Sequence, residues 1–296
     1  MQITHWFRAR KRTTIRNKLT IHFSNSLRIM VNDVHLRYAI HKSMKCQCCI
    51  PEYQSVLSSY DRKRYSHKCS VSLIDATTTM AAMQYQNYNV CVLNFACSVE
   101  PGGGVLLGSV AQEESICRRS TLFPCLCSPE MYTQFYYPHI KSGAFVGTDD
   151  CIYTPNVIVF QSEDFYPRLL KKEKWFKMSV ITCSAPALNH TSLKGRSLYE
   201  IHKKRLTRIL DIAVRKNTEV IVLGAFGCGA FRNDPHIVSE AMIDVIKHYR
   251  YAFKWIIFAI PTYDKNEENY MVFQKTITHN FSESKPVENN GKITFY

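Results

Sequence analysis

The stretch Val90-Cys-Val-Leu-Asn-Phe95, followed by Glu100-Pro-Gly-Gly-Gly104 and then by Gln112-Glu-Glu114, indicates the fold most directly. Its first part is a short apolar run, which is typical of a buried strand. Three adjacent glycines predict a loop that lets the backbone approach another group closely, because no Cβ stands in the way. A helix-like segment begins near Gln112. The stretch therefore predicts a strand, a glycine loop and a helix in succession.

The same alternation continues along the chain. Apolar runs predict four more buried strands, and two longer segments predict helices. Pro235, preceded by Asp234, is a favourable start for the second of these helices. The predicted strands cover residues 156–160, 179–183, 219–223 and 255–260, and the predicted helices cover 198–216 and 235–249. Buried strands that alternate with helices indicate an α/β domain with a mostly parallel or mixed central sheet.

A second glycine-rich loop, Gly224-Ala-Phe-Gly-Cys-Gly-Ala-Phe-Arg-Asn-Asp234, follows the strand predicted at 219–223. Successive backbone N–H groups in such loops bind anions, and a following helix N-terminus adds positive potential. Neither loop has the Gly-Lys-Ser/Thr ending of a Walker motif or the strict order of a dinucleotide-binding loop. Ordinary tight turns are the alternative. Two such loops at equivalent places favour a pyrophosphate held at the carboxyl edge of the sheet.

Two adjacent carboxylates, Glu113 and Glu114, stand at the start of the helix after the first loop. Acidic residues are common there simply because they complement the helix dipole. These two also follow a loop of the anion-binding type, where a bound anion would raise the pKa of a neighbouring carboxyl group. A general acid near neutral pH requires such a raised pKa.

The order Asn94-Phe-Ala-Cys-Ser98, Pro101-Gly-Gly-Gly104 and Gln112-Glu-Glu114 resembles the signature of the microbial-type poly(ADP-ribose) glycohydrolases, which are macrodomain enzymes. The likeness continues in order through residues 115–122, 153–160, 180–186 and 224–235, and it covers about residues 70–262. The resemblance implies a macrodomain-like three-layer α/β sandwich with a mixed central sheet. It also implies an enzyme that hydrolyses ribose glycosidic bonds in poly(ADP-ribose) and releases ADP-ribose.

The resemblance also implies roles for individual residues. Glu114 would be the catalytic acid and Glu113 would bind the hydroxyls of the ribose under attack. The glycines of the first loop would approach that ribose and the diphosphate, the second loop would line the diphosphate, and its phenylalanine would pack against the terminal ribose. The substrate-binding residues would be Asn94, Gly102, Gly103, Gly104, Gln112, Gly227, Cys228, Gly229, Ala230 and Phe231. No metal and no cofactor is expected.

One residue departs from the family pattern. The family usually has Asn directly before Pro-Gly-Gly-Gly, whereas this chain has Glu100, which would alter the charge of the pocket but would not remove the acid. Two alternatives stay open from the sequence. A non-catalytic ADP-ribose-binding module would share both loops but would generally lack Glu114. A mono-ADP-ribosyl hydrolase would share the acid, and the sequence does not distinguish the length of the substrate chain.

The charge is strongly positive and unevenly distributed. The 296 residues carry a formal charge of +14, and no acidic residue precedes Asp33. We expect three parts: a basic extension over residues 1–65, partly disordered; a macrodomain-like catalytic domain over 66–278; and a polar tail over 279–296. Besides ADP-ribose or poly(ADP-ribose)-modified proteins, the basic arm predicts a contact with nucleic acid. We expect a monomer.

The cysteines and the apolar runs bear on the cellular setting. Several of the 12 cysteines lie in strand-like runs, where cysteine behaves as a small buried hydrophobe. No signal peptide and no apolar run of membrane-spanning length is visible. The spacing in Cys46-Gln-Cys-Cys49 is not that of a zinc finger. We therefore expect an intracellular protein in the cytoplasm or nucleus, although an Arg-rich arm is also compatible with organelle targeting.

Overall fold

The computed structural model describes residues 2–56, 62–143, 146–262, 267–281, 287–289 and 292–295. Within these residues nine strands form one mixed sheet in the order β1-β4-β5-β3-β6-β7-β2-β9-β8. The strands are β1 (Cys48–Ile50), β2 (Ser70–Ile74), β3 (Val90–Phe95), β4 (Cys151–Val159), β5 (Phe176–Cys183), β6 (Val220–Leu223), β7 (Trp255–Ala259), β8 (Val287–Asn289) and β9 (Lys292–Phe295).

The centre of the sheet is parallel. Strands β5, β3, β6, β7 and β2 run in one direction, whereas β4 pairs antiparallel with β5 and β9 pairs antiparallel with β2. The strands predicted from the apolar runs are present in this sheet, and its predicted mixed character is confirmed. Because parallel strands end at the same edge, the loops that follow β3 and β6 lie next to each other.

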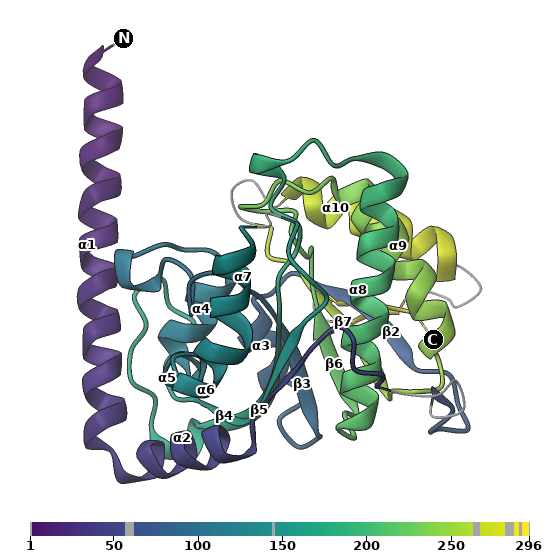
Figure 1. Cartoon of the computed structure of the whole chain (residues 1–296), viewed down its shortest axis with the longest axis horizontal. Helices are drawn as coiled ribbons and strands as arrows, with labels where there is room; N and C mark the ends of the chain where they lie inside the picture. Colours follow the sequence, from purple (N-terminus) through teal and green to yellow (C-terminus); the bar gives the residue numbers. More distant parts are fainter. Residues whose placement is uncertain are drawn as a thin grey trace.

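Helices cover both faces of the sheet (Figure 1). They are α1 (Gln2–Asn32), α2 (Val34–Cys46), α3 (Thr78–Met83), α4 (Gln112–Arg119), α5 (Leu122–Leu126), α6 (Pro129–Met131), α7 (Tyr137–Ser142), α8 (Gly195–Arg215), α9 (Pro235–Ile246) and α10 (Glu267–Phe281). One apolar core joins the sheet to α8, α9 and α10, and a second core joins the opposite face to α3, α4, α5 and α6. The predicted three-layer sandwich is thus confirmed.

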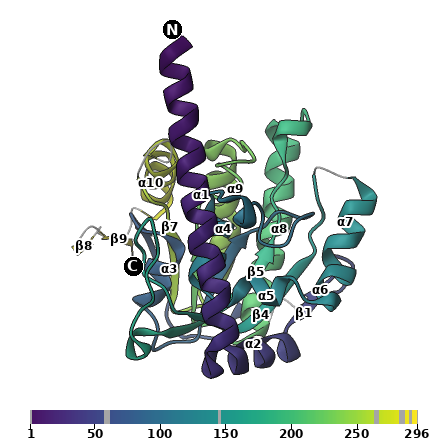
Figure 2. The same cartoon turned by 90° about the vertical axis from the view of Figure 1, so that its left-hand side faces the viewer.

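The N-terminal segment is helical, and its second half is packed on the domain. Leu19 and Phe23 of α1 are buried, and the ring of Phe23 meets Phe123 edge-on at 5.0 Å. Strand β1 then pairs with β4 at the edge of the sheet. Figures 1 and 2 show the first turns of α1 projecting beyond the body of the molecule. The boundary predicted near residue 65 is therefore not visible in the packing. The many basic residues of this segment made it look like a solvated extension, although it also carries apolar side chains that pack on the domain.

The polar tail predicted over residues 279–296 also contributes to the sheet. Helix α10 continues to Phe281, and strand β9 pairs with β2 in the register Val71↔Phe295 to Ile74↔Lys292. The predicted boundary at 278 is therefore not visible in the packing either. Within the described part of the chain, no helix combines the length and apolarity needed to cross a membrane.

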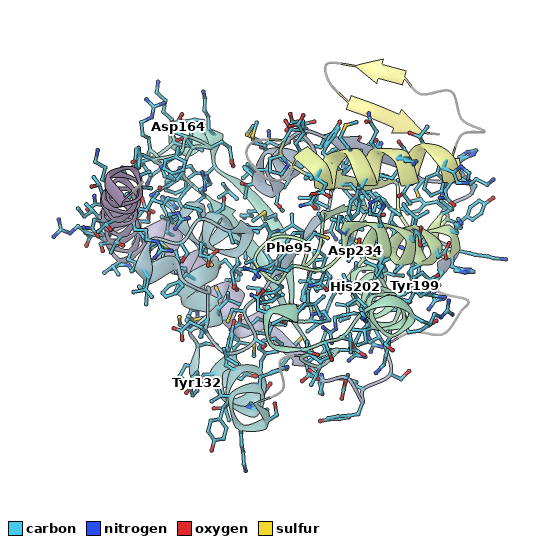
Figure 3. All side chains as sticks on the ribbon, turned by 90° about the horizontal axis from the view of Figure 1, so that it is seen from above. Phe95, Tyr132, Asp164, Tyr199, His202 and Asp234 are labelled. Carbon is cyan, nitrogen blue, oxygen red and sulfur yellow. The ribbon has the colours of Figure 1, made fainter. Side chains whose placement is uncertain are left out.

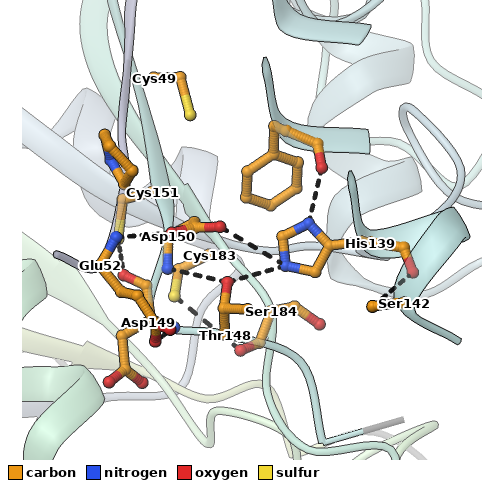
Figure 4. A network of polar contacts seen from close by, with 12 residues as sticks. Cys49, Glu52, His139, Ser142, Thr148, Asp149, Asp150, Cys151, Cys183 and Ser184 are labelled. Carbon is orange, nitrogen blue, oxygen red and sulfur yellow. Dashed lines mark hydrogen bonds and ion pairs between the residues drawn. The ribbon is translucent and has the colours of Figure 1, made fainter. Parts of the chain in front are cut away.

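A polar network fixes the loop that leads into β4 (Figure 4). His139 of α7 bonds the carbonyl of Phe135 through Nδ1 at 2.6 Å and the hydroxyl of Thr148 through Nε2 at 2.9 Å. Asp149, one residue further on, pairs with the buried guanidinium of Arg205 at 3.0 Å. Strand β4 begins at Cys151, and its Ile152 pairs with Thr182 near the end of β5, so this network lies at the same sheet edge that carries the two glycine loops.

Candidate active site

The first glycine loop holds both carboxylates of α4. Glu113 accepts hydrogen bonds from Asn94 Nδ2 at 3.1 Å and from the backbone N–H of Cys97 at 2.8 Å. Glu114 accepts one from the backbone N–H of Gly104 at 2.9 Å. Both glutamates are almost fully buried. The structure therefore brings the two predicted catalytic residues together with Asn94, which holds Glu113.

Glycine is required at the centre of this loop. Gly103 has a φ of +57°, and a Cβ there would lie 2.7 Å from Oε1 of Glu114 and 3.1 Å from Oε2 of Glu113. Its own N–H donates to the carbonyl of Glu100 at 2.9 Å. The amides of Gly103 and Gly104 are thus used within the protein. The first loop does not supply the free anion-binding amides that its sequence suggested, and instead it covers and holds the carboxylate pair.

The side chain of Gln112 is held by three hydrogen bonds within the protein. Its Oε1 accepts the backbone N–H of Phe95 at 2.8 Å, and its Nε2 donates to the carbonyl of Leu93 at 2.7 Å and to Thr78 Oγ1 at 3.0 Å. These bonds tie the start of α4 to the end of β3 and saturate the side-chain amide. Gln112 was predicted to bind substrate; the structure indicates that it positions the two glutamates that follow it.

The electrostatics of the pair follow from burial. Burial raises the pKa of Glu113 to about 8, opposed by the N–H groups of Cys97 and Asn94, and the adjacent Glu114 carboxylate raises it further. The second oxygen of Glu114, Oε2, is buried without a hydrogen-bond partner among the described residues. Both oxygens of Glu113 already accept hydrogen bonds, so Glu114 Oε2 is the oxygen of the pair that is free to act on a ligand.

The second loop, residues 224–234, supplies free amides. In the described structure the backbone N–H groups of Gly229, Ala230 and Phe231 make no hydrogen bond, whereas that of Cys228 donates to the carbonyl of Ala225 at 3.1 Å. Successive unpaired N–H groups form an anion-binding concavity. The Cys228 amide is therefore already paired and is not available for the predicted diphosphate contact, whereas the amides of the three following residues are unpaired in the described structure. A Cβ on Gly229 would meet no protein atom within 4 Å.

A buried asparagine, which we did not predict as a site residue, holds this second loop. The Nδ2 of Asn233 donates to the carbonyls of Pro186 at 2.8 Å, Gly227 at 3.1 Å and Phe231 at 3.2 Å. Its Oδ1 bonds His202 Nε2 at 2.8 Å. Burial lowers the pKa of His202 to about 4, so its ring is neutral at pH 7 and donates to that oxygen. The ring of Phe226 lies 5.5 Å from that of Phe95 and 5.8 Å from that of His202, so these three rings form one cluster; Phe95 and His202 are labelled in Figure 3.

Gly227 and Phe231 complete the predicted set on this side. Gly227 is buried with a φ of +81°, and a Cβ there would lie 2.6 Å from the side chain of Ala185. Phe231 is half-buried, and its carbonyl accepts the N–H of Leu188 at 3.1 Å. Both residues line a cavity of about 360 Å³ that extends from the end of β3 to the segment after β7. A cavity of this size is in the range of small-ligand sites.

Glu100, the residue that departs from the family pattern, is exposed. Its carbonyl accepts the N–H of Gly103, and its carboxylate makes no hydrogen bond or ion pair with any described residue. Glu100 is therefore placed at the surface beside the first loop, away from the hydrogen bonds that hold Glu113 and Glu114.

The outer side of the first loop rests on α1. Gly108 has a φ of +71°, and a Cβ there would lie 2.3 Å from the carbonyl oxygen of Arg16. The hydroxyl of Thr20 donates to the carbonyl of Leu106 at 3.4 Å, and Arg118 of α4 donates to the carbonyl of Ser109 at 2.6 Å. The basic N-terminal helix thus supports the loop that holds the carboxylates. No local pattern predicts this contact, because it depends on backbone atoms that are distant in the chain.

A parallel sheet edge with one loop over a buried carboxylate pair and another with free amides defines a macrodomain-like hydrolase. Within that class, residues 19–162 match the family described as microbial-type PARG, catalytic domain, where PARG denotes poly(ADP-ribose) glycohydrolase. The match to this family confirms the resemblance seen in the sequence. No protein with a curated description matches the chain.

Solved structures agree over most of the fold. The poly(ADP-ribose) glycohydrolase of Thermomonospora curvata is 22% identical with a TM-score of 0.78, and the match covers 88% of this chain and 100% of that one. Its complex with the inhibitor ADP-HPD is 23% identical with a TM-score of 0.76, and covers 88% and 99%. The Deinococcus radiodurans enzyme in complex with ADP-ribose is 27% identical with a TM-score of 0.74, and covers 81% and 97%.

Proposed function

We propose that this protein is a poly(ADP-ribose) glycohydrolase that releases ADP-ribose and uses Glu114 as its acid and base. The observation that carries the proposal is the arrangement of the carboxylate pair. Glu114 Oε2 is buried and unpaired, whereas the oxygens of Glu113 are held by Asn94 and Cys97. The family match and the solved glycohydrolases support the same reaction.

The substrate is positioned by the two loops together. The free amides of Gly229, Ala230 and Phe231 hold the diphosphate, and the ring of Phe231 packs against the terminal ribose. The ribose lies over Gly103, where the absence of a side chain leaves room beside both carboxylates. Glu113, held in place by Asn94, accepts hydrogen bonds from the ribose hydroxyls.

The reaction breaks the bond between the anomeric carbon and the leaving oxygen. Glu114 Oε2 is the oxygen of the pair that is free to carry the transferred proton, because both oxygens of Glu113 already accept hydrogen bonds. Glu114 gives this proton to the leaving oxygen, and the nearby diphosphate stabilises the oxocarbenium-like ribose. Water then attacks the anomeric carbon and returns a proton to Glu114, which restores the acid.

The two other functions are separated by one pair of measurements. A non-catalytic ADP-ribose-binding module would bind ADP-ribose in isothermal titration and would release none from a poly(ADP-ribosyl)ated protein. A mono-ADP-ribosyl hydrolase would release ADP-ribose from a singly modified protein and leave the polymer intact. We expect release of ADP-ribose from the polymer, and either of the other patterns would replace the proposal.

The basic arm supports an additional contact with polyanions. Four basic residues lie near the start of α1: Arg8, Arg10, Lys11 and Arg12. Nucleic acid or the polymer itself would neutralise this charge, so binding would weaken steeply with salt. Deleting residues 1–12 keeps the packed half of α1 and should flatten the salt dependence of nucleic-acid binding. An unchanged dependence would assign the contact elsewhere. The monomeric state and the compartment stay predictions.

A further inference from the structure

A buried arginine lies one helical turn after the proposed acid. Arg118 of α4 is 3% exposed, and Glu114, four residues earlier on the same helix, is 7% exposed. Side chains at this spacing share one face of a helix, and a glutamate that precedes an arginine is the favourable order of charges. Arg118 Nη2 donates to the carbonyl of Ser109 at 2.6 Å, and Glu114 Oε1 accepts the N–H of Gly104 at 2.9 Å. The first glycine loop therefore holds one end of each side chain.

The other end of each side chain has no protein partner. Arg118 Nη1 and Glu114 Oε2 are both buried without a hydrogen bond among the described residues, and no ion pair joins Arg118 to a carboxylate in that part of the chain. The two groups nevertheless act on each other through their charges. Burial lowers the pKa of Arg118 to about 10, Arg119 lowers it further, and Glu114 raises it. Arg118 therefore stays charged at neutral pH and leaves Glu114 Oε2 free for a ligand.

The other basic groups around α4 are exposed or already paired. The helix packs against α1, α3, α5, β3 and the short turn Val105–Leu107. Of these elements, α3, α5, β3 and the turn contain no acidic or basic side chain. On α1 the ring of His22 stacks on a tyrosine at 5.2 Å, and three basic residues of its described side chains are exposed: Arg16, Lys18 and Arg28. Arg119 is buried, but it pairs with Glu163 at 3.5 Å.

The thiols and the phenol near the carboxylate pair carry no charge at neutral pH. Burial raises the pKa of each of them above its ordinary value, and the Glu113 carboxylate raises it further: Cys97, Cys117 and Tyr136. Arg118 is therefore the buried cation near Glu114 that no carboxylate of the described structure neutralises.

The reaction creates a demand for such a cation. Once Glu114 has given its proton to the leaving oxygen, its carboxylate is a new negative charge beside Glu113, in a site where both side chains are almost fully buried. Burial and a neighbouring carboxylate both disfavour this charge, whereas a fixed cation nearby stabilises it. A cation that made a direct ion pair with Oε2 would block the ligand, but Arg118 does not occupy that oxygen.

We propose that Arg118 is a positioning residue for the acid. It holds the first loop through Ser109, and its charge stabilises the Glu114 carboxylate in the half of the reaction in which the proton has been transferred. This inference rests on the proposed function, because it takes Glu114 as the acid. Arg118 exchanges no proton itself: the proton passes from Glu114 to the leaving oxygen, and the attacking water returns one to Glu114.

The test measures how kcat/KM for ADP-ribose release from a poly(ADP-ribosyl)ated protein depends on pH, between about pH 5.5 and about pH 9.5. Release needs the acid with its proton, so the rate falls on the alkaline side, where this proton has been lost. Arg118→Gln removes the charge and keeps an amide that can donate a hydrogen bond. We expect the alkaline fall to move upward by about 1 pH unit, because a nearby opposite charge lowers the pKa of a carboxyl group by about 1–3 units. The rate at the optimum should fall about tenfold, since one pKa unit is a factor of ten in acid strength.

Further variants separate the charge of Arg118 from its hydrogen bond. Arg118→Lys keeps the charge, so its alkaline fall should stay close to that of the wild-type protein. The matched control is Arg28→Gln, which removes one exposed charge from α1 and should change neither the rate nor its pH dependence. Arg118→Met, which keeps the apolar stem of the side chain, replaces the glutamine variant if that variant does not fold.

The outcomes distinguish this inference from the proposed function. An alkaline fall that stays in place in a folded, uncharged Arg118 variant, or that moves equally in Arg118→Lys, would overturn the inference while the proposed function stands. Arg118 would then only hold the first loop through Ser109. A wild-type protein that releases no ADP-ribose from the polymer would instead overturn the proposed function.

Discussion

Replacing Glu113 by glutamine tests how the buried carboxylate pair is charged. Burial raises the pKa of Glu113 from its ordinary value of 4.5 to about 8 in the folded protein. The folded state therefore binds more protons than the unfolded state between these values, and the free energy of unfolding falls as the pH rises. The separation between 4.5 and about 8 corresponds to about 5 kcal/mol when titration is complete.

The change in unfolding free energy over an accessible pH range is smaller than the value for complete titration. Between about pH 5.5 and 8.5 the wild-type protein should lose about 3 kcal/mol of unfolding free energy relative to Glu113→Gln, since ionisation in the unfolded state is already advanced at the lower pH. The glutamine variant is the matched reference, because other titrating groups cancel in the difference. Urea denaturation at several pH values measures it. A difference between the two proteins that does not change with pH would refute the reasoning.

Three further substitutions have defined outcomes. Gly108→Val should destabilise the fold by about 2–4 kcal/mol in urea denaturation, because it combines a positive φ with a clash against Arg16. Asn233→Ala should cost a similar about 2–4 kcal/mol and abolish ADP-ribose binding in titration, since three bonds that hold the second loop are lost. Gly229→Ala should leave the melting temperature within about 2 °C, because no protein atom meets the new methyl group, yet weaken ADP-ribose binding.

The sequence predicted the central sheet and the pairing of the two loops well. Apolar runs such as the one at β3 identify buried strands reliably when turn residues bound them. The parallel order then brings the ends of β3 and β6 to one edge. Residues near in sequence, such as Glu113 and Glu114 beside the glycines, were therefore correctly expected to meet.

What the sequence could not predict depends on contacts between distant segments. The support of Gly108 by Arg16 joins backbone atoms about ninety residues apart, and no local pattern marks it. The sequence also does not predict in which direction an individual backbone N–H group points. The glycines of the first loop turn their amides toward Glu114 and Glu100, whereas the second loop leaves three amides free. Because both loops are rich in glycine, the sequence predicted the same anion-binding role for both.

The pairing of Asn233 with His202 illustrates the same limit. Asn233 lies within the quoted second loop, but its role depends on a histidine of α8 that is buried and neutral. Strands β1 and β9 were likewise missed, because strands of three or four residues gain their stability from the partner strand rather than from their own composition.

The assignment of Glu114 is tested most directly by Glu114→Gln, which keeps the oxygen that accepts the Gly104 N–H and removes the proton-carrying oxygen. The measurement is the rate of ADP-ribose release from a poly(ADP-ribosyl)ated protein, with ADP-ribose affinity determined on the same preparation. We predict a loss of about 10²- to 10⁴-fold in rate, as for removal of a general acid, with affinity changed less than about threefold. Wild-type turnover by Glu114→Gln would contradict the account.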